Sequence, residues 1–294
     1  MKYNAVINAV KEILAEYTSP LTLRQLFYRL VSKQLIPNTR SSYCQLSQQL
    51  VEAREQEHVD RGMLEDRGRQ VLGEDDWGYE NPEDFLECLT GGLKSQWENY
   101  QRPLWTDQPN KILLCVEKDS LSTIFTSVAE PYRIKVFPNK GYCSFSYVHK
   151  ILTECDEEKT NIILYFGDYD PSGRDIQRSL EERLLKYAGF SPTNLILKRI
   201  ALTEKQIQEY NLPPKPEDSA TLAKLQRDPR ARTYGIEYAC ELDALNPAVL
   251  TRLIGEAIHS HLDSELWTSQ FKLQEVEKQS AKELLRRITI VTGV

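Results

Sequence analysis

Several features that would point to particular functions are missing from this sequence. The 294 residues include six cysteines but no CxxC pair, so neither a zinc site nor a disulfide framework is expected. No stretch approaches the roughly 18 consecutive apolar residues of a membrane-spanning helix. The opening residues carry charges inside an apolar periodicity, which is typical of an amphipathic helix and not of a signal peptide. We therefore expect a cytoplasmic protein with reduced thiols and no membrane contact.

The sequence also lacks an excess of positive charge. Its net charge is -6, which argues at first against nucleic-acid binding, because phosphate contacts need Lys and Arg. The charge is unevenly distributed, however: +2 in residues 1–72, -7 in residues 73–109 and -1 in residues 110–294. The acidity therefore belongs to one local segment, and nucleic-acid binding by the rest of the chain is not excluded.

The first segment, residues 1–72, has the pattern of short helices joined by short links. The predicted helices are residues 4–16, 22–33 and 41–57. Thr22 can cap the second helix, and Gln25 three residues later completes a capping box. This spacing is typical of a winged-helix or helix-turn-helix module.

Residues 73–109 are acidic, contain Gly, Pro and three Trp residues, and are expected to form an ordered connector. From residue 110 to 294 the pattern alternates between strands and helices. The predicted strands are KILLCVE, RIKVF, NIILYF and LILKRI; the predicted helices are SFSYVHKILTEC and residues 203–210 and 246–262. Uniformly apolar strands separated by helices indicate an α/β fold with a parallel sheet, followed by C-terminal helical additions.

Carboxylates follow two of the predicted strands. Glu117 ends the first run, while Asp168 and Asp170 follow NIILYF. In an open parallel sheet, functional side chains gather beyond the carboxyl ends of the strands. A cluster of three carboxylates repels itself unless a cation fills it, and Mg²⁺ binds through a few carboxylates while keeping waters that a phosphate can displace. The pattern predicts a magnesium site suited to phosphodiester transfer.

Two other interpretations of these acidic residues were weighed. Each carboxylate alone could be an ordinary surface group at the start of a loop. Alternatively, Asp168, Asp170, Ser172 and Gly173 fit the first positions of an EF-hand calcium loop, but Ser179 stands where the bidentate Glu is needed and the preceding segment is a predicted strand.

The second predicted helix carries a possible nucleophile. Arg24 and Tyr28 are spaced i and i+4 on one helical face. A phenol is a poor nucleophile near neutral pH unless its phenolate is stabilised, and a guanidinium one turn away can do that or hold the target phosphate. The alternative is a tyrosine at the edge of the core with its hydroxyl in water.

Together these motifs resemble a known family. The order VEKDS, NKGYCS and GDYDPSG resembles the Toprim fold of topoisomerases, primases and several nucleases, and DYDPSGRDI is most similar to the version in the topoisomerase VI A subunit and its meiotic double-strand-break relatives. Upstream, Thr22, Arg24, Phe27 and Tyr28 match the T-x-R-x-x-F/Y-Y signature of that family's winged helix. The similarity covers about residues 20–260 and is closest to the short, stand-alone A-like forms.

The resemblance implies a mechanism. Tyr28 would attack a DNA phosphate and form a 5′-phosphotyrosine link, with Mg²⁺ held by Glu117, Asp168 and Asp170, and with Arg24 and Glu117 assisting the chemistry. We also expect Arg24, Arg29, Arg40 and Lys140 to contact DNA. Two alternatives remain open: a Toprim nuclease in which water attacks and Tyr28 is structural, and a DNA-binding protein without turnover.

The resemblance also implies partners. The family's tyrosine works with the Toprim site of the other subunit, so we expect a homodimer on double-stranded DNA, associated with the nucleoid. The chain has no Walker A sequence, so an ATP-driven reaction would need a separate B-type ATPase subunit. The basic loop at residues 212–232, which includes Lys215, would either follow the DNA backbone or be solvated, and Glu241 and Asp243 are expected only to pack.

Overall fold

The computed structural model describes residues 3–17, 20–65, 79–215, 223 and 225–292. The chain divides into two compact units, one of Met1–Arg69 with Ile112–Ser260 and one of Gln70–Lys111 with His261–Val294. The predicted domain boundary at residue 72 lies outside the described residues. Within the described ranges, no helix is both long and apolar enough to cross a lipid bilayer.

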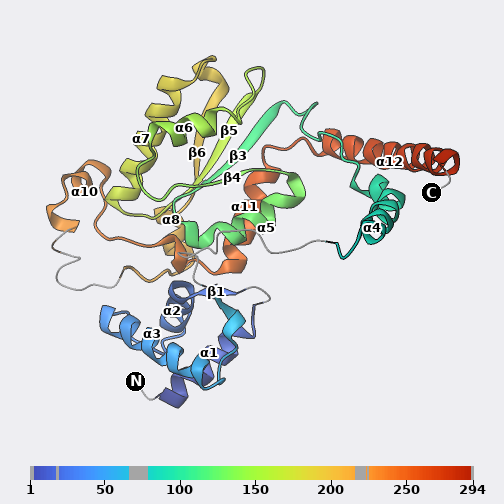
Figure 1. Cartoon of the computed structure of the whole chain (residues 1–294). Coiled ribbons are helices and arrows are strands. Elements are labelled where there is room, and N and C mark those ends of the chain that lie inside the picture. Colours follow the sequence, from blue (N-terminus) through green and yellow to red (C-terminus); the bar gives the residue numbers. More distant parts are fainter. Residues whose placement is uncertain (1–2, 18–19, 66–78, 216–222, 224, 293–294) are drawn as a thin grey trace. The chain divides into compact units, whose positions relative to one another are not determined.

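The chain begins with three helices and two short strands (Figure 1). These elements are α1 (Tyr3–Leu14), β1 (Leu21–Thr22), α2 (Leu23–Ser32), α3 (Arg40–Glu55) and β2 (Leu64–Glu65). The predicted capping box is confirmed, because the Thr22 hydroxyl accepts from the Gln25 backbone and the Gln25 side chain accepts from the Thr22 backbone. β1 and β2 pair in parallel, so the chain returns after α3 to the start of α2.

A four-stranded parallel sheet follows, as the sequence predicts. Its strands are β3 (Asn110–Val116), β4 (Val136–Pro138), β5 (Thr160–Phe166) and β6 (Leu195–Ala201), arranged in the order β4-β3-β5-β6. Because β4 lies on one side of β3 and β5 on the other, the chain reverses its direction of travel across the sheet at β3. This is the topological switch point at which open α/β sheets hold their ligands.

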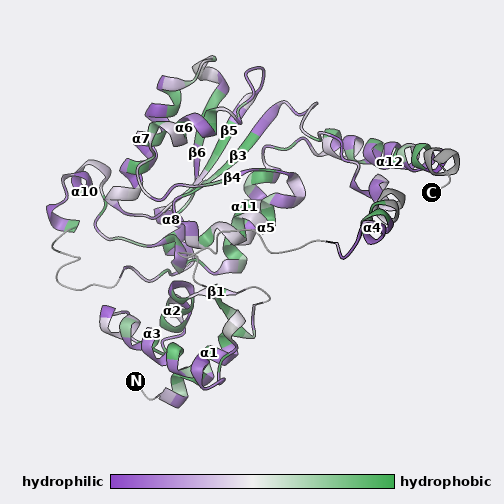
Figure 2. Ribbon diagram, in the orientation of Figure 1, coloured by the Kyte–Doolittle hydropathy of each residue, from purple (hydrophilic) through white to green (hydrophobic). Residues whose placement is uncertain are grey.

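Helices cover both faces of the sheet. The helices concerned are α5 (Ser122–Ala129), α6 (Phe145–Leu152), α7 (Pro171–Tyr187) and α11 (Pro247–His259). Side chains alternate between faces along a strand, so Cys115 and Tyr165 pack against α6 and α7, whereas Phe166 meets Phe125 of α5 on the other face. Figure 2 shows the result as hydrophobic colour along β5 and mixed colour along α7. Burial on both faces explains why these strands are apolar runs.

The segment predicted as a loop at residues 212–232 is only partly a loop. Residues 216–222 and 224 lie outside the described part, but helix α10 (Pro229–Tyr234) begins inside the predicted loop. Asp228 caps this helix and Pro229 occupies its first turn, which is the ordinary start signal of a helix. The preceding helix α8 (Glu204–Glu209) agrees with the prediction.

The second unit pairs the middle of the chain with its C-terminal part. It contains α4 (Pro82–Ser95), the short helix η2 (Gln96–Asn99) and the long helix α12 (Ser264–Thr292). Trp105 packs edge-to-face on Trp267 with ring centroids 5.6 Å apart, and Arg102 donates to Gln270 and pairs with Glu277 of α12. Lys282 of α12 lies over the Trp97 ring. Trp97 and Trp105, two of the tryptophans of the predicted connector, therefore both have partners in this unit.

Candidate functional site

The first two predicted metal ligands meet at the switch point of the sheet. Glu117 follows β3, and its backbone N–H donates to the Phe166 carbonyl at the end of β5 over 2.8 Å. The Asp168 backbone N–H in turn donates to Oε2 of Glu117 over 2.9 Å. Parallel pairing of the two strands therefore brings together residues that are 51 positions apart in the sequence.

The third predicted ligand, Asp170, also begins a helix. One carboxylate oxygen of Asp170 accepts from the Gly173 N–H over 2.7 Å and so caps the 17-residue helix α7, in which Pro171 occupies the first turn. The EF-hand alternative is wrong, because Ser172 and Gly173 lie inside this helix instead of in a calcium-binding loop. The other Asp170 oxygen accepts a hydrogen bond from the Lys215 ammonium.

Two glycines allow the chain to pack closely around the Glu117 carboxylate. A Cβ atom on Gly167 would lie 2.5 Å from Oε2 of Glu117 and 2.7 Å from the Tyr165 ring, and a Cβ on Gly173 would lie 2.7 Å from the Asp168 carbonyl. A Cβ at either position would force these neighbours to shift, so both positions favour glycine. The absence of side chains at these two positions therefore lets the backbone pack closely around the Glu117 carboxylate.

Two further carboxylates, Glu241 and Asp243, join the site from a distant segment. Tyr169 and Cys240 exchange backbone hydrogen bonds of 2.9 Å in an isolated antiparallel bridge, and the Leu242 N–H donates to Asp168 over 2.8 Å. The side chain of Asp243 is fully buried, and its Oδ1 atom has no hydrogen-bond partner among the described residues. We call Glu117, Asp168, Asp170, Glu241 and Asp243 the acidic cluster.

Lys118 enters the acidic cluster from the end of β3. Its ammonium lies 2.6 Å from Asp243, 3.1 Å from Asp168 and 3.3 Å from Glu241. Burial alone would lower the pKa of Lys118, but the carboxylates of Asp168 and Asp243 outweigh that effect and raise it, so the side chain stays protonated.

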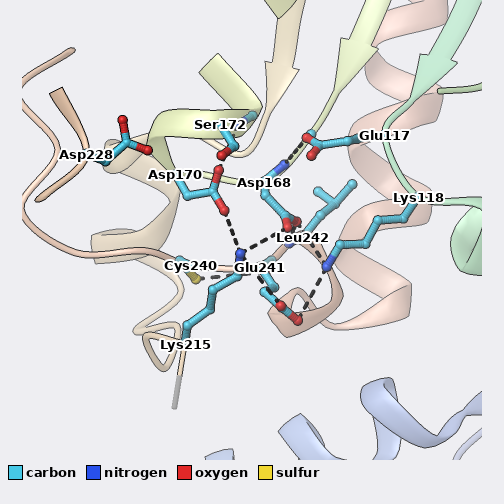
Figure 3. A network of polar contacts seen from close by, with 12 residues as sticks. Glu117, Lys118, Asp168, Asp170, Ser172, Lys215, Asp228, Cys240, Glu241 and Leu242 are labelled. Atoms are coloured by element: carbon cyan, nitrogen blue, oxygen red, sulfur yellow. Dashed lines mark hydrogen bonds and ion pairs between the residues drawn. The ribbon is translucent and has the colours of Figure 1, made fainter. Parts of the chain in front are cut away.

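Lys215 reaches the acidic cluster from another direction (Figure 3). Its ammonium lies 2.5 Å from Asp170, 3.5 Å from Asp168 and 3.7 Å from Glu241. Burial would raise the pKa of Asp168, but the two lysine ammonium groups outweigh this and hold it below its ordinary value. Lys215, which the sequence places in a DNA-tracking or solvated loop, is instead a partly buried member of an ion network.

Glu117 has a different environment from the other carboxylates. Burial and the neighbouring charge of Asp168 raise its pKa to about 7. Neither lysine forms an ion pair with Glu117, and Glu117 has no other ion pair among the described residues. The negative charge of the cluster is therefore compensated at Asp168 and Asp170 but left uncompensated at Glu117.

The donor chemistry of the acidic cluster suits a hard divalent cation. Five carboxylates face two ammonium groups and the Arg24 guanidinium, so negative charge is in excess, and one buried oxygen of Asp243 lacks a partner among the described residues. As arranged, however, no three acidic, His or Cys side chains in the described part of the chain converge closely enough to hold a metal ion. The residues fit Mg²⁺ by charge and ligand type, and the ammonium groups now stand between them.

Helix α2 brings the predicted catalytic pair Arg24 and Tyr28 to this cluster. Arg24 donates to both oxygens of Glu241 over 2.7 Å, across 217 positions of sequence. Tyr28 is only 2% exposed, so its ring is part of the core. Burial raises the pKa of Tyr28 well above its ordinary value, Glu241 raises it further, and Lys118 opposes the shift.

The other predicted DNA contacts lie in different environments. Arg29 is largely buried and donates to the Ala244 carbonyl, whereas Arg40 is exposed at the start of α3. Lys140 is exposed and pairs with Asp119 over 2.9 Å. A cleft of about 660 Å³ is lined by the cations Arg24, Arg54, Lys118 and Lys140, by the anions Asp119 and Asp243, and by neutral residues of α2 and α3.

Four residues of the site were not predicted as functional: Lys118, Lys215, Glu241 and Asp243. Lys118 stands directly beside Glu117, and its position within VEKDS was the available signal. The alternating acids of ECELDALNP were a second signal, but the bridge that carries them to Asp168 is a long-range pairing that no local pattern encodes.

No protein-family model matches the chain. A search of the curated proteins likewise gives no match.

Proposed function

We propose that this protein cleaves DNA by metal-dependent phosphodiester transfer, with Tyr28 as the nucleophile, in the manner of a topoisomerase VI A subunit. The observation that carries the proposal is the link from α2 to the acidic cluster. Nη1 of Arg24, a residue of the predicted tyrosine signature, donates to both oxygens of Glu241. Glu241 and Asp168 both pair with Lys118 and Lys215. The two motifs of the resemblance are thus joined through side chains in one compact unit.

The finer fold assignment belongs to the same proposal. Three helices with a small two-stranded sheet suit a winged-helix module in residues 1–72. The order β4-β3-β5-β6, with acidic residues at the ends of β3 and β5, suits a Toprim domain with a C-terminal extension in residues 110–294, with the acidic connector of residues 73–109 between the two.

The proposed reaction exchanges one phosphate ester for another. The Tyr28 hydroxyl loses its proton as its oxygen bonds to the phosphorus; the bond from phosphorus to the 3′ oxygen breaks, and that oxygen takes a proton. The products are a 5′-phosphotyrosine link and a free 3′-hydroxyl. Glu117 would also act as general acid or base; its pKa of about 7 is that of the site without a cation, and a bound Mg²⁺ would lower it. Mg²⁺ held by Glu117, Asp168 and Asp170 would stabilise the negative charge that develops on the phosphate.

A second candidate is a Toprim nuclease in which water attacks the phosphate. The burial of Tyr28 favours it, because a tyrosine that is 2% exposed, with a raised pKa, is a poor nucleophile in that position. In this version the acidic cluster keeps its role and Tyr28 is a core residue of α2, whose ring meets that of its neighbour Phe27 edge-to-face.

The test is cleavage of supercoiled plasmid with Mg²⁺, stopped with denaturing detergent and analysed with and without protease. Wild type is compared with Tyr28→Phe and Asp168→Ala. We expect protein-linked DNA ends from the wild type and none from either variant. Cleavage that survives Tyr28→Phe but not Asp168→Ala would establish the hydrolytic nuclease instead. Absence of cleavage by all three proteins would contradict both candidates for the isolated chain and favour DNA binding without turnover.

We also propose a homodimer acting on both strands of a duplex, with a separate B-type subunit needed for any ATP-driven step. Sedimentation of the purified protein at several concentrations tests the dimer directly. A monomer at all concentrations, with and without DNA, would contradict it.

A further inference from the structure

Lys215 is bound to part of the predicted metal site. Its ammonium lies within ion-pair distance of both Asp168 and Asp170, which are two of the three predicted ligands. The Lys215 ammonium places one positive charge beside the carboxylate oxygens that would bind a divalent cation. Both cations cannot hold those oxygens at once, because they repel each other at that range.

The two lysines of the cluster differ in how firmly they are held. The Lys118 ammonium forms an ion pair with the fully buried Asp243, and it also pairs with Asp168 and Glu241. Lys215 is fixed through its backbone, whose N–H donates to the Ala239 carbonyl over 2.7 Å, while its side chain lies along the wall of a cavity of about 750 Å³. This cavity, which Asp170 and Asp228 also line, gives the side chain room to leave without moving the chain.

We propose that Lys215 is an internal counter-ion that holds the acidic cluster together without metal and is displaced into the neighbouring cavity when a divalent cation binds. The inference rests on the proposed metal site. Lys215 then sets the affinity of the site, because each Mg²⁺ ion must first break the ion pairs with Asp170 and Asp168.

Mg²⁺ binding measured by titration calorimetry tests the proposal on three full-length proteins: wild type, Lys215→Met and Lys205→Met. Lys205 is exposed on α8, so its substitution removes the same charge from the same unit outside the acidic cluster. Removing the competing ammonium should lower the Mg²⁺ dissociation constant at least about tenfold in Lys215→Met. In Lys205→Met it should stay within about twofold of wild type.

The outcomes separate this inference from the proposed function. Equal Mg²⁺ affinity in wild type and Lys215→Met would overturn the role of Lys215 and leave the metal site standing. Absence of Mg²⁺ binding in both proteins would overturn the metal site as well. Binding by the variant alone would support the inference in its strongest form.

A measurement on the wild type covers the case in which Lys215→Met does not fold. The Lys215 amine is labelled with an acylating reagent in EDTA and in excess Mg²⁺, and the labelled peptides are quantified by mass spectrometry. Displacement should increase labelling of Lys215 several-fold in Mg²⁺ and leave labelling of Lys205 unchanged. A Lys215 amine that remains equally protected in both conditions would overturn the proposal.

Discussion

Glu117 is a largely buried carboxylate whose pKa is raised and which has no ion pair among the described residues. The two lysines of the site neutralise Asp168 and Asp170, so Glu117 is left buried beside their negative charges. Its raised pKa means that the folded protein holds this proton more tightly than the unfolded chain does. In the absence of divalent cations, this group stabilises the fold below pH 4.5, and the stabilisation is lost as pH rises from about 4.5 to about 7.

Replacing Glu117 with Gln should therefore remove part of the pH dependence of stability. In EDTA, we expect Glu117→Gln to be more stable than wild type at pH 8, by on the order of 2 kcal/mol, and to differ little from it at pH 4.5. Denaturant unfolding at a series of pH values measures the difference. Glu209→Gln, on the exposed surface of α8, serves as the control and should follow the wild-type curve. Parallel curves for wild type and Glu117→Gln would contradict the assigned environment.

Gly167 tests the close packing around the same carboxylate. A methyl group at this position would lie 2.5 Å from Oε2 of Glu117 and 2.7 Å from the Tyr165 ring, so one of them must move. We expect Gly167→Ala to lower the free energy of unfolding by about 1–3 kcal/mol. Gly189→Ala is the matched control, because nothing lies within 4 Å of its added Cβ. Equal melting temperatures for the two variants would show that the packing around the Glu117 carboxylate is looser than these distances indicate.

At the scale of elements, the sequence predicted most where burial is continuous. β3 and β5 are covered on both faces, so they are long apolar runs whose ends mark Glu117 and Asp168. β4 is only three residues long and was predicted less well, because its pattern merges with the preceding RIK. Helix α10 was missed although Asp228 and Pro229 signal its start, since the basic, proline-rich surroundings suggested a loop.

The site could be predicted only in part for a related physical reason. Strand ends can be read from local apolar patterns, and these gave three acidic residues. Lys215 reaches Asp170 across 45 positions, and the segment that carries Glu241 is joined to Asp168 by the Leu242 N–H across 74 positions. Such pairings depend on the whole fold. The sequence therefore indicated the acidic residues at the strand ends and left out both lysines and the acidic residues of the distant segment.

Helix α7 allows the structural and functional roles of Asp170 to be separated. Its side chain caps the helix and also pairs with Lys215. Asparagine keeps an oxygen that can accept from the Gly173 N–H, whereas alanine does not. We expect Asp170→Ala to be about 1 kcal/mol less stable than Asp170→Asn in EDTA, and both variants to lose Mg²⁺ binding. Thermal unfolding and calorimetry measure the two effects; Mg²⁺ binding that persists in Asp170→Asn would argue against Asp170 as a ligand.

At the scale of the whole molecule, net charge and binding chemistry point in opposite directions. The chain carries -6, yet Arg24, Arg54, Lys118 and Lys140 line one cleft. Phosphate contacts act over a short range in salt, since the screening length is about 8 Å at physiological ionic strength. The charges that line the cleft itself therefore matter more for phosphate contacts than the total charge does, and there the four cations outnumber the two anions, Asp119 and Asp243.

This argument predicts how DNA affinity depends on salt. In EDTA, which prevents cleavage, binding of a duplex should weaken steeply as salt rises, with a slope of about 0.9 in log affinity against log salt for each phosphate contact. Lys140 is exposed at the cleft, so Lys140→Ala should weaken binding and flatten this slope by about one contact. Fluorescence anisotropy at several salt concentrations measures both quantities.

The control for the salt experiment is Lys205→Ala, which removes the same charge from the exposed surface of α8. If the total charge of the molecule governs binding, both variants change the affinity equally and neither changes the slope. If the cleft governs it, only Lys140→Ala changes the slope, and the effect is the same on duplexes of different sequence, because a phosphate contact reads no bases. An unchanged slope for Lys140→Ala would place the DNA contacts elsewhere on the protein.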